Sequence, residues 1–319
     1  MPEKKLISIA IAAYNGEKYI AQQIESLLKQ TLLPDEIIIC DDSADDLTSK
    51  AVQSFAADSR IKYFKNPVSL GTAGNFEKAV SLCSGDYIFL CDQDDVWLPE
   101  KVEVMYNMLA ADEELDCVFC NSILTDGNLE KLDKTLWDLR KFTPAMQKKL
   151  SSGGALEVFC RRVVCSGHNI AFKRRILEYI LPFPELAPFY PDTWIALSTA
   201  FNGNVQAVDR VLTLYRVHDA NSSNPAGAAL QGAAKARRSS AAKRNDLLAE
   251  EILKRSKSNK LCRRKMLEEF AALHRKRSLY NSNIFIRSIQ ALGQLFALKY
   301  ARYANGIRTF AADVIFSQR

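Results

Sequence analysis

The sequence lacks any long uninterrupted apolar stretch. Nowhere in its 319 residues does an apolar run reach the roughly 18 to 20 residues that a membrane-spanning helix needs. Residues Met1 to Lys5 lead into an apolar run, Leu6 to Ala13, that is too short for a signal peptide, so we interpret it as a first strand. Low-complexity tracts are absent too, and 48% hydrophobic with 25% charged residues is the composition of a soluble globular protein.

A regular cysteine framework is also missing. The eight cysteines stand mostly inside apolar runs, at positions 40, 83, 91, 117, 120, 160, 165 and 262. Reduced thiols of this kind are typical of cytoplasmic proteins, and we expect that location. Cys117 and Cys120 form a C-x-x-C pair, but no second pair stands at zinc-finger spacing, which favours buried core thiols over a zinc site.

Charge is distributed unevenly along the chain, whose formal net charge is +6. Residues 227–319 contain 20 Lys or Arg against 6 Asp or Glu, a net charge of +14, which leaves −8 for residues 1–226. The two regions therefore face different partners.

Short strands alternate with amphipathic helices in the first hundred residues. The patterns predict strands at 6–13, 36–40, 61–64 and 86–91, and helices at 17–30, 47–55 and 75–82. Such alternation predicts βαβ units and a parallel sheet, in which ligands bind beyond the carboxyl ends of the strands. Three strand ends carry polar groups that could meet there: Tyr14-Asn15-Gly16, Asp41-Asp42 and Asp92 to Asp95.

The most acidic strand end is Asp92-Gln93-Asp94-Asp95. Carboxylates this close repel one another, and a hard dication such as Mg²⁺ or Mn²⁺ would supply a counter-charge while taking diphosphate oxygens as further ligands. The metal would then stabilise a departing nucleotide diphosphate. The alternative interpretation is a solvated acidic turn that caps the next helix.

Three blocks of sequence resemble a known family. They are Ser8 to Gly16 (SIAIAAYNG), Pro34 to Ser43 (PDEIIICDDS) and Gly85 to Trp97 (GDYIFLCDQDDVW). Their order and spacing, over residues 6 to about 218, resemble the inverting glycosyltransferases of family 2. The ending Asp-Gln-Asp-Asp-x-Trp is similar to the rhamnosyltransferase-like branch of that family.

The resemblance implies a fold and an activity. The fold is the GT-A nucleotide-diphospho-sugar transferase fold, an α/β architecture with a Rossmann-like, mainly parallel sheet, at residues 1–220. A basic helical region would follow at 221–319, after a flexible linker near 221–232. The activity is metal-dependent transfer of a sugar, with rhamnose as one candidate, from a nucleotide-diphosphate donor. The acceptor would be a glycan or a lipid-linked oligosaccharide in bacterial cell-surface polysaccharide synthesis.

Carried over position by position, the resemblance implies a nucleotide site. Ala13, Tyr14 and Glu17 would surround the base and ribose, and Asp41 and Asp42 would hydrogen-bond the pyrimidine.

The phosphate side departs from the family pattern. Many members carry Ala-Arg-Asn where this chain has Gly71 to Lys78 (GTAGNFEK), so the expected arginine is absent. Lys78 is a candidate substitute, and a helix N-terminus near Asn75 would favour the phosphates electrostatically.

The same resemblance implies the metal ligands. Asp92 and Asp94 match the family's metal motif, with Asp94 preferred as the direct ligand and Asp95 orienting the loop or the sugar. Downstream, Tyr215-Arg216-Val217-His218 would let His218 complete the metal site or contact the diphosphate, while Arg216 neutralises phosphate charge. An ordinary surface histidine is the alternative for His218. His168 remains unassigned, though it could line the acceptor pocket.

The catalytic base is implied to be Asp192. In the family, a carboxylate at the start of a helix beyond the metal motif takes the proton of the acceptor hydroxyl, and Tyr190-Pro191-Asp192-Thr193-Trp194 fits that position. A purely structural N-cap is the alternative, since Asp after Pro and before an apolar helix is a strong start signal.

The C-terminal region is basic and periodic. Basic residues from Lys235 to Arg277 lack a nucleic-acid module, which favours an anionic membrane surface over nucleic acid. From Ile284 onward, apolar residues recur at near-helical spacing between basic ones, as in an interfacial helix pair on the inner face of the plasma membrane. Packing onto the chain's own core, or onto a second copy in a homo-oligomer, remains open.

Two other functions compete with glycosyl transfer. A catalytically silent module that binds nucleotide sugar or anionic lipid would explain the missing arginine and the basic tail, although it needs no positioned base. A nucleotidyltransferase would need a glycine-rich basic loop near the N-terminus, which the sequence lacks.

Overall fold

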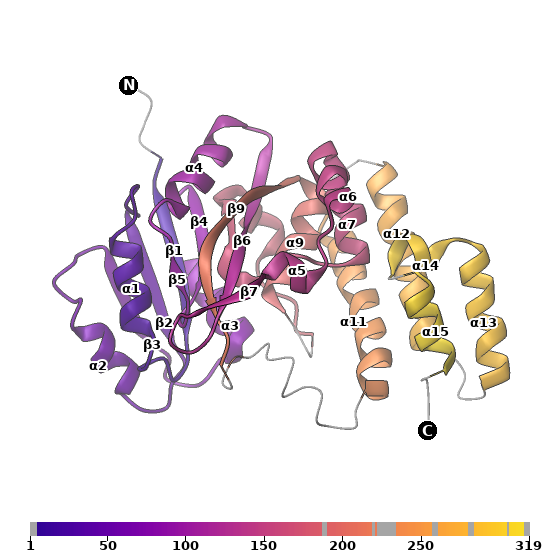
Figure 1. Ribbon diagram of the computed structural model, residues 1–319, viewed down its shortest axis with the longest axis horizontal. Helices are drawn as coiled ribbons and strands as arrows, with labels where there is room; N and C mark the ends of the chain where they lie inside the picture. The colour runs from indigo at the N-terminus through magenta and orange to yellow at the C-terminus, as the bar shows by residue number, and fades with distance from the viewer. Residues whose placement is uncertain are drawn as a thin grey trace.

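The computed structural model describes residues 5–186, 190–218, 221, 234–256, 261–279, 284–304 and 306–315. One curved sheet of nine strands runs through the N-terminal two thirds, with helices on both faces (Figure 1). The strands are β1 (Ile7–Ala13), β2 (Glu36–Asp41), β3 (Ile61–Lys65), β4 (Tyr87–Asp92), β5 (Val96–Trp97), β6 (Leu115–Thr125), β7 (Lys131–Thr135), β8 (Ile170–Lys173) and β9 (Asn204–Arg216).

The helices fall into two groups along the chain. Those of the sheet region are α1 (Ile20–Leu28), α2 (Leu47–Gln53), α3 (Gly71–Leu82), α4 (Lys101–Ala111), α5 (Leu136–Arg140), α6 (Pro144–Lys149), α7 (Ala155–Arg161), α8 (Leu177–Ile180) and α9 (Pro191–Asn202). Those of the C-terminal region are α11 (Ala234–Arg255), α12 (Leu261–Ser278), α13 (Ile284–Phe296), α14 (Lys299–Tyr303) and α15 (Ile307–Ile315).

The first half of the sheet is parallel, as the alternating pattern predicted. Its order is β3-β2-β1-β4, all parallel, which confirms the four predicted strands. Beyond β4 the sheet is mixed. β8 lies antiparallel between β4 and β6, β9 runs parallel to β6, and the two-residue β5 pairs antiparallel with β9.

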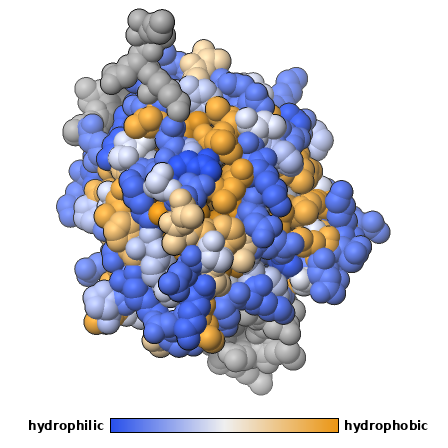
Figure 2. Space-filling model, turned by 90° about the vertical axis from the view of Figure 1, so that its left-hand side faces the viewer, coloured by the Kyte–Doolittle hydropathy of each residue, from blue (hydrophilic) through white to orange (hydrophobic). Residues whose placement is uncertain are grey.

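Each face of the sheet has its own apolar core because alternate residues of a strand point to opposite sides. Ile9 and Ile11 of β1 pack with α1 and α4, whereas Ala10 faces α3, α7 and α9. Figure 2 shows the side of the molecule where α1 and α2 lie, with hydrophilic side chains around smaller apolar areas.

Two boundaries differ from the sequence-based expectation. α3 begins at Gly71 rather than near Asn75, so Asn75 lies inside the helix and not at its N-terminus. The stretch from 136 to 161, which shows no clear period, forms the short helices α5, α6 and α7.

The C-terminal helices share a core with the sheet region. Leu248 of α11, Phe270 of α12 and Tyr303 of α14 are buried in the same apolar cluster as Phe159 and Trp194. In Figure 1, α11 and α12 stand next to α9 and α7, and α13 lies outermost. Packing of this region onto the chain's own core is therefore observed. The division at 220 stays a prediction, since most of the expected linker lies outside the described residues.

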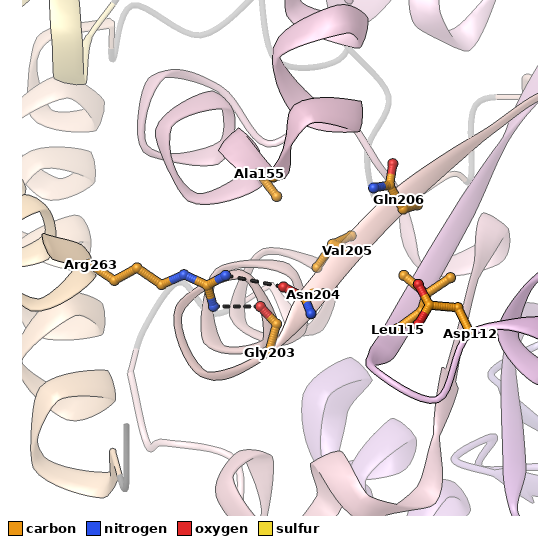
Figure 3. Close-up of a pocket in the computed structure, with 9 residues that line it drawn as sticks. Asp112, Leu115, Ala155, Gly203, Asn204, Val205, Gln206 and Arg263 are labelled. Carbon is orange, nitrogen blue, oxygen red and sulfur yellow. Dashed lines mark hydrogen bonds between the residues drawn. The ribbon is translucent and has the colours of Figure 1, made fainter. Parts of the chain in front are cut away.

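Arg263 of α12 illustrates this attachment. Its guanidinium donates to the carbonyl oxygen of Gly203 at 2.6 Å and to Oδ1 of Asn204 at 3.1 Å, beside a cavity of about 170 Å³ (Figure 3). β6 and β9 begin here, so the cavity lies at the opposite edge of the sheet from the acidic strand ends. It is therefore not the candidate active site.

A buried carboxylate ties the starts of three strands together. Glu36 accepts from Oγ of Ser8 at 2.6 Å, from the backbone and hydroxyl of Ser84, and from Nζ of Lys62 at 2.7 Å. Burial alone would raise the pKa of Glu36, but these donors outweigh it and lower the pKa to about 2.

Glu36→Gln should remove the part of the free energy of unfolding that depends on ionisation of Glu36. A carboxyl pKa lowered from 4.5 to about 2 stabilises the fold above pH 4.5, and this stabilisation is lost as the pH falls toward 2. Because Lys62 is half exposed, we expect a loss of about 2 kcal/mol at pH 7 rather than the full electrostatic value. Urea unfolding from pH 7 to pH 3 measures it, with exposed Glu25→Gln as control. Equal pH slopes for wild type and Glu36→Gln would contradict the assignment.

Candidate active site

The three polar strand ends lie side by side at one edge of the sheet. The register pairs Ala13 with Asp41 and Ala12 with Asp92, so the turns after β1, β2 and β4 are neighbours. This is the edge at which parallel α/β sheets bind ligands.

The turn after β1 is fixed by its neighbours. Asn15 has φ 49°, and its backbone N–H donates to Oγ of Ser43, while that of Gly16 donates to Oγ1 of Thr48. A Cβ at position 16 would lie 2.2 Å from Oε1 of Gln93, so a larger residue there would displace the Gln93 side chain. The turn leaves the Tyr14 side chain 59% exposed, where a flat ligand can stack.

Gln93 connects this turn to the acidic loop. Its Oε1 accepts from the backbone N–H of Tyr14 at 2.8 Å, and its Nε2 donates to the carbonyl of Tyr14 at 2.8 Å. The sequence gives Gln93 no role of its own, yet it fixes the loop after β4 against the loop after β1. Of the other expected nucleotide residues, Ala13 is buried and Glu17 is exposed.

The two carboxylates after β2 are occupied by the chain itself. Asp41 is fully buried and accepts from Ser43 and from the hydroxyl of Tyr63. Asp42 accepts from the backbone N–H groups of Leu70 and Gly71. Burial opposes ionisation of Asp42, but these donors and nearby side chains lower its pKa. Pyrimidine binding by either carboxylate stays a prediction, and it would have to share or replace these bonds.

The residues expected near the phosphates, Asn75 and Lys78, make contacts within the chain, and phosphate binding by them stays a prediction. The first amides of α3 donate to Asp42, so this helix N-terminus already holds an anion. Asn75 is buried and donates to the carbonyls of Ala13 and Cys40, which joins β1 to β2. Nζ of Lys78 donates to Oδ1 of Asn66 at 2.6 Å. These residues therefore stabilise the strand ends in this structure.

Asp94 and His218 meet, as expected from the resemblance. Nε2 of His218 lies 2.9 Å from Oδ2 of Asp94, and Asn221 approaches the same oxygen at 3.3 Å. Burial, together with the charge of Asp92, raises the pKa of Asp94 to about 6, although His218 acts in the opposite direction. The His218 ring also packs on Tyr19, with 4.9 Å between centroids.

Strand pairing brings this downstream segment to the acidic loop. β5 follows Asp95 directly and pairs with β9, so Arg216 lies beside the loop. Arg216 is 2% exposed, and its guanidinium donates to the carbonyls of Asp94 and Gly127 and to Oε1 of Gln22. These donors hold the loop in this structure, and a contact of Arg216 with phosphate stays a prediction.

His168, left unassigned from the sequence, lies with Asp92 and Asp95 in a group that we call the acidic centre. Its Nδ1 lies 3.7 Å from an oxygen of Asp92 and 3.7 Å from one of Asp95. Among the described residues, Asp92, Asp95 and His168 form a group whose potential ligand atoms lie within 4.8 Å of one another. The three expected metal ligands, Asp92, Asp94 and His218, therefore lie in two groups. Asp94 lies with His218, whereas Asp92 lies nearer His168.

One buried oxygen atom indicates that a hard cation fits the acidic centre. Oδ2 of Asp95 is buried and has no hydrogen-bond partner within the described residues, although its Oδ1 accepts from Arg216. Burial and the charges of Asp94 and Asp92 raise the pKa of Asp95. A dication would relieve both the repulsion and the missing partner.

A buried lysine supplies part of the counter-charge. Lys101, in the first turn of α4, is 1% exposed, and its Nζ donates to the carbonyl of His168 and to Thr213. The ammonium also lies 3.7 Å from the centroid of the Trp97 ring. Burial lowers the pKa of Lys101, and the charges of Asp95 and Asp92 oppose that shift. A sequence pattern gives no signal for it, because its partners come from distant segments.

Asp192 lies in the first turn of α9, but not as its N-cap. The N-cap is Tyr190, and Oδ1 of Asp192 accepts from the backbone N–H of Thr193 at 2.6 Å. Burial raises the pKa of Asp192, Arg140 counteracts this, and the charge of Asp92 raises it further. The two carboxylates are therefore within electrostatic reach of each other.

Comparison with known proteins agrees with this architecture. The family model "Glycosyl transferase family 2" matches residues 8–181, and the chain therefore belongs to that family. An uncharacterized glycosyltransferase of Nostoc sp. is 28% identical over 227 residues, 70% of this chain and 68% of that protein. The Escherichia coli UDP-Glc:alpha-D-GlcNAc-diphosphoundecaprenol beta-1,3-glucosyltransferase WfgD is 39% identical over 104 residues. That match spans 33% of this chain and less than half, 41%, of WfgD.

Solved structures share the fold. TarS of S. aureus in complex with UDP has a TM-score of 0.57 at 16% identity, over 89% of this chain and 75% of that one. The mannosyltransferase PcManGT of Pyrobaculum calidifontis, in complex with GDP-Man and Mn²⁺, has a TM-score of 0.54 at 15% identity, over 99% and 88%. The predicted GT-A fold is confirmed.

Asp94→Asn should weaken Mn²⁺ binding at least about tenfold, because Asp94 keeps 14% of its side chain exposed and a cation that binds diphosphate must be reached from solvent. Asp95→Asn should weaken Mn²⁺ binding less than Asp94→Asn, because the unexposed Asp95 can offer the cation only its unpartnered Oδ2. Calorimetric titration of Mn²⁺ measures both variants. A larger loss in Asp95→Asn would move the site to Asp92, Asp95 and His168.

Proposed function

We propose that the chain is a metal-dependent, inverting glycosyltransferase. It transfers a sugar, for which rhamnose is one candidate, from a nucleotide-diphosphate donor to a glycan or lipid-linked acceptor in bacterial cell-surface polysaccharide synthesis. The observation that carries the proposal is the position of Asp192 in the first turn of α9, partly buried and within electrostatic reach of Asp92 at the strand ends where we place the nucleotide. WfgD, as its name states, uses UDP-Glc and a diphosphoundecaprenol-linked acceptor, which supports this substrate class.

The donor lies along the strand ends in this mechanism. The nucleobase stacks near exposed Tyr14, and the diphosphate reaches Asp92, Asp94 and His218. A bound Mg²⁺ or Mn²⁺ at these carboxylates would neutralise charge on the departing diphosphate. Arg216 and Gln93 hold the loop in place by contacts to its backbone and to Tyr14.

Asp192 provides the base. Its carboxylate takes the proton of the acceptor hydroxyl while that oxygen attacks the anomeric carbon and the bond from this carbon to the diphosphate oxygen breaks. A pKa raised by burial makes this carboxylate a stronger base than an ordinary aspartate. Attack from the side opposite the leaving diphosphate inverts the anomeric centre.

A catalytically silent binding module is the second candidate. The absent phosphate-side arginine and the basic C-terminal region favour it. Calorimetric binding of a nucleotide sugar with no transfer or hydrolysis in the presence of Mn²⁺ would decide for it.

Asp192→Asn should lower turnover about 10²- to 10⁴-fold with donor affinity nearly unchanged, the usual contribution of a general base. Asparagine keeps the size and the contact to Thr193, so folding should persist. Transfer from a panel of nucleotide sugars, followed by mass spectrometry, provides the rate, and calorimetry provides the donor affinity.

Two further measurements make this test specific. Exposed Asp209→Asn is the control and should keep wild-type turnover. Activity should fall with decreasing pH as Asp192 is protonated, at a higher pH than for an aspartate of ordinary pKa, because its pKa is raised. Wild-type turnover in Asp192→Asn, or a loss of donor affinity parallel to activity, would show that the base lies elsewhere.

We also propose that the C-terminal helices contact an anionic membrane surface. Phe296 is 81% exposed and Ile307 71%, and residues 270–312 contain no Asp or Glu but seven Lys or Arg. Apolar side chains among basic ones suit the boundary of anionic lipid. No helix in the described parts of the chain is long and apolar enough to cross a bilayer.

Phe296→Ser combined with Ile307→Ser should release the protein from vesicles. These residues lie on the surface, so the core around Tyr300 and Tyr303 stays intact. Sedimentation with vesicles of phosphatidylglycerol and phosphatidylcholine should show at least about a tenfold loss of binding, because two apolar side chains leave the interface. Leu261→Ser, exposed on α12, is the control. A variant that converts a dimer to a monomer without changing vesicle binding would instead assign this surface to a second copy.

A further inference from the structure

Five arginines form an electrostatically connected group, and two of them, Arg140 and Arg244, face Asp192 at the start of α9. We call them the arginine cluster: Arg140 of α5, Arg161 of α7, the adjacent Arg162, Arg244 of α11 and Arg308 of α15. Asp192 lies within electrostatic reach of Arg140 and Arg244, and Arg162 within reach of the other three. The cluster thus combines two helices of the sheet region with two of the C-terminal region.

The contacts of its inner members leave donors available. The Cζ atom of Arg244 lies 5.1 Å from the centroid of the Tyr190 ring, and its Nε is buried without a hydrogen-bond partner in the described part of the chain. One guanidinium nitrogen of Arg140 donates to Oγ of Ser166 at 3.1 Å. Within the described residues, neither arginine forms an ion pair with a carboxylate.

Other arginines of the chain are paired with acids. Arg175, Arg255 and Arg277 each lie 2.6 Å from a carboxylate oxygen, of Asp116, Glu251 and Asp313 respectively. Arg140 and Arg244, by contrast, face one and the same carboxylate, that of Asp192. Burial and the neighbouring arginines lower the pKa of Arg162, and burial lowers that of Arg244.

Arg140, Arg162 and Arg244 are partly buried, and partly buried cations held together raise the free energy of the fold unless an anion joins them. Guanidinium groups bind phosphate oxygens through paired, charge-assisted hydrogen bonds. Arg140 and Arg244 face Asp192, whereas the strand ends at which we place the nucleotide carry carboxylates. A phosphoryl group at the cluster therefore belongs to the molecule that meets Asp192.

We propose that the arginine cluster binds phosphoryl oxygens of the acceptor, so that the acceptor is a sugar linked through phosphate or diphosphate rather than a neutral glycan. The assignment to the acceptor rests on the proposed function, because it takes Asp192 as the base. Arg244 and Arg308 then give the C-terminal helices a direct part in substrate binding.

Binding of inorganic pyrophosphate in metal-free buffer tests the cluster without turnover. Without a cation, Asp92, Asp94 and Asp95 repel this anion, so binding reports the arginines. Arg140→Gln and Arg244→Gln should each weaken binding about tenfold, the loss expected for one charge-assisted hydrogen bond. Arg244→Lys should recover part of it. Arg210→Gln, at an exposed arginine paired with Glu100, should bind like wild type.

Transfer to two acceptors then identifies the source of the phosphate. With a sugar on a short-chain lipid diphosphate, the Arg140→Gln and Arg244→Gln variants should raise the acceptor KM about tenfold and leave the donor KM unchanged. With the same sugar on a neutral alkyl chain, wild type and variants should behave alike.

The outcomes separate the two proposals. Pyrophosphate binding that depends on the arginines, without any transfer by wild type, would keep the anion site and remove the catalytic function. Transfer that is insensitive to both substitutions would keep the function and overturn the anion site. Variants that lose binding to phosphatidylglycerol vesicles but bind pyrophosphate like wild type would assign the arginines to lipid headgroups and overturn the acceptor site.

Discussion

Mutual repulsion among Asp92, Asp94 and Asp95 is the constraint on which the rest of the site depends. Three carboxylates follow one buried strand, and two of them have raised pKa values because burial disfavours their charge. Buried cations offset part of this repulsion. Lys101 supplies buried positive charge, and Arg216 holds the loop by a hydrogen bond to the carbonyl of Asp94. Removing Lys101 or Arg216 would leave more of the repulsion among these carboxylates uncompensated and would destabilise the fold.

The sheet and its strand-end loops could be predicted because each depends on local sequence. β-branched runs such as EIIIC mark buried strands, and parallel strands necessarily bring their carboxyl ends together. The meeting of Asp94 with His218, 124 residues apart, followed from a family resemblance and not from local pattern.

The contacts that could not be predicted from the sequence have one thing in common. The partners of these side chains are backbone atoms or side chains distant in the sequence. Asp42 looks like a ligand-binding acid in the sequence, yet its hydrogen bonds go to amides 28 and 29 residues away. Lys101 looks like an ordinary start of a helix, but its acceptors lie 67 and 112 residues away. Residue type shows that a group can bind charge, whereas only the fold decides whether that charge comes from a ligand or from the chain.

The hydrogen bonds between Gln93 and the backbone of Tyr14 join two loops. If the backbone at position 14 shifts to accommodate a different base, the shift reaches the carboxylates on either side of Gln93. Affinity for the cation and fit of the base are then thermodynamically linked, and the linkage is reciprocal. With the nucleotide and the cation bound as proposed, mutations that relax base selectivity would alter metal affinity as well.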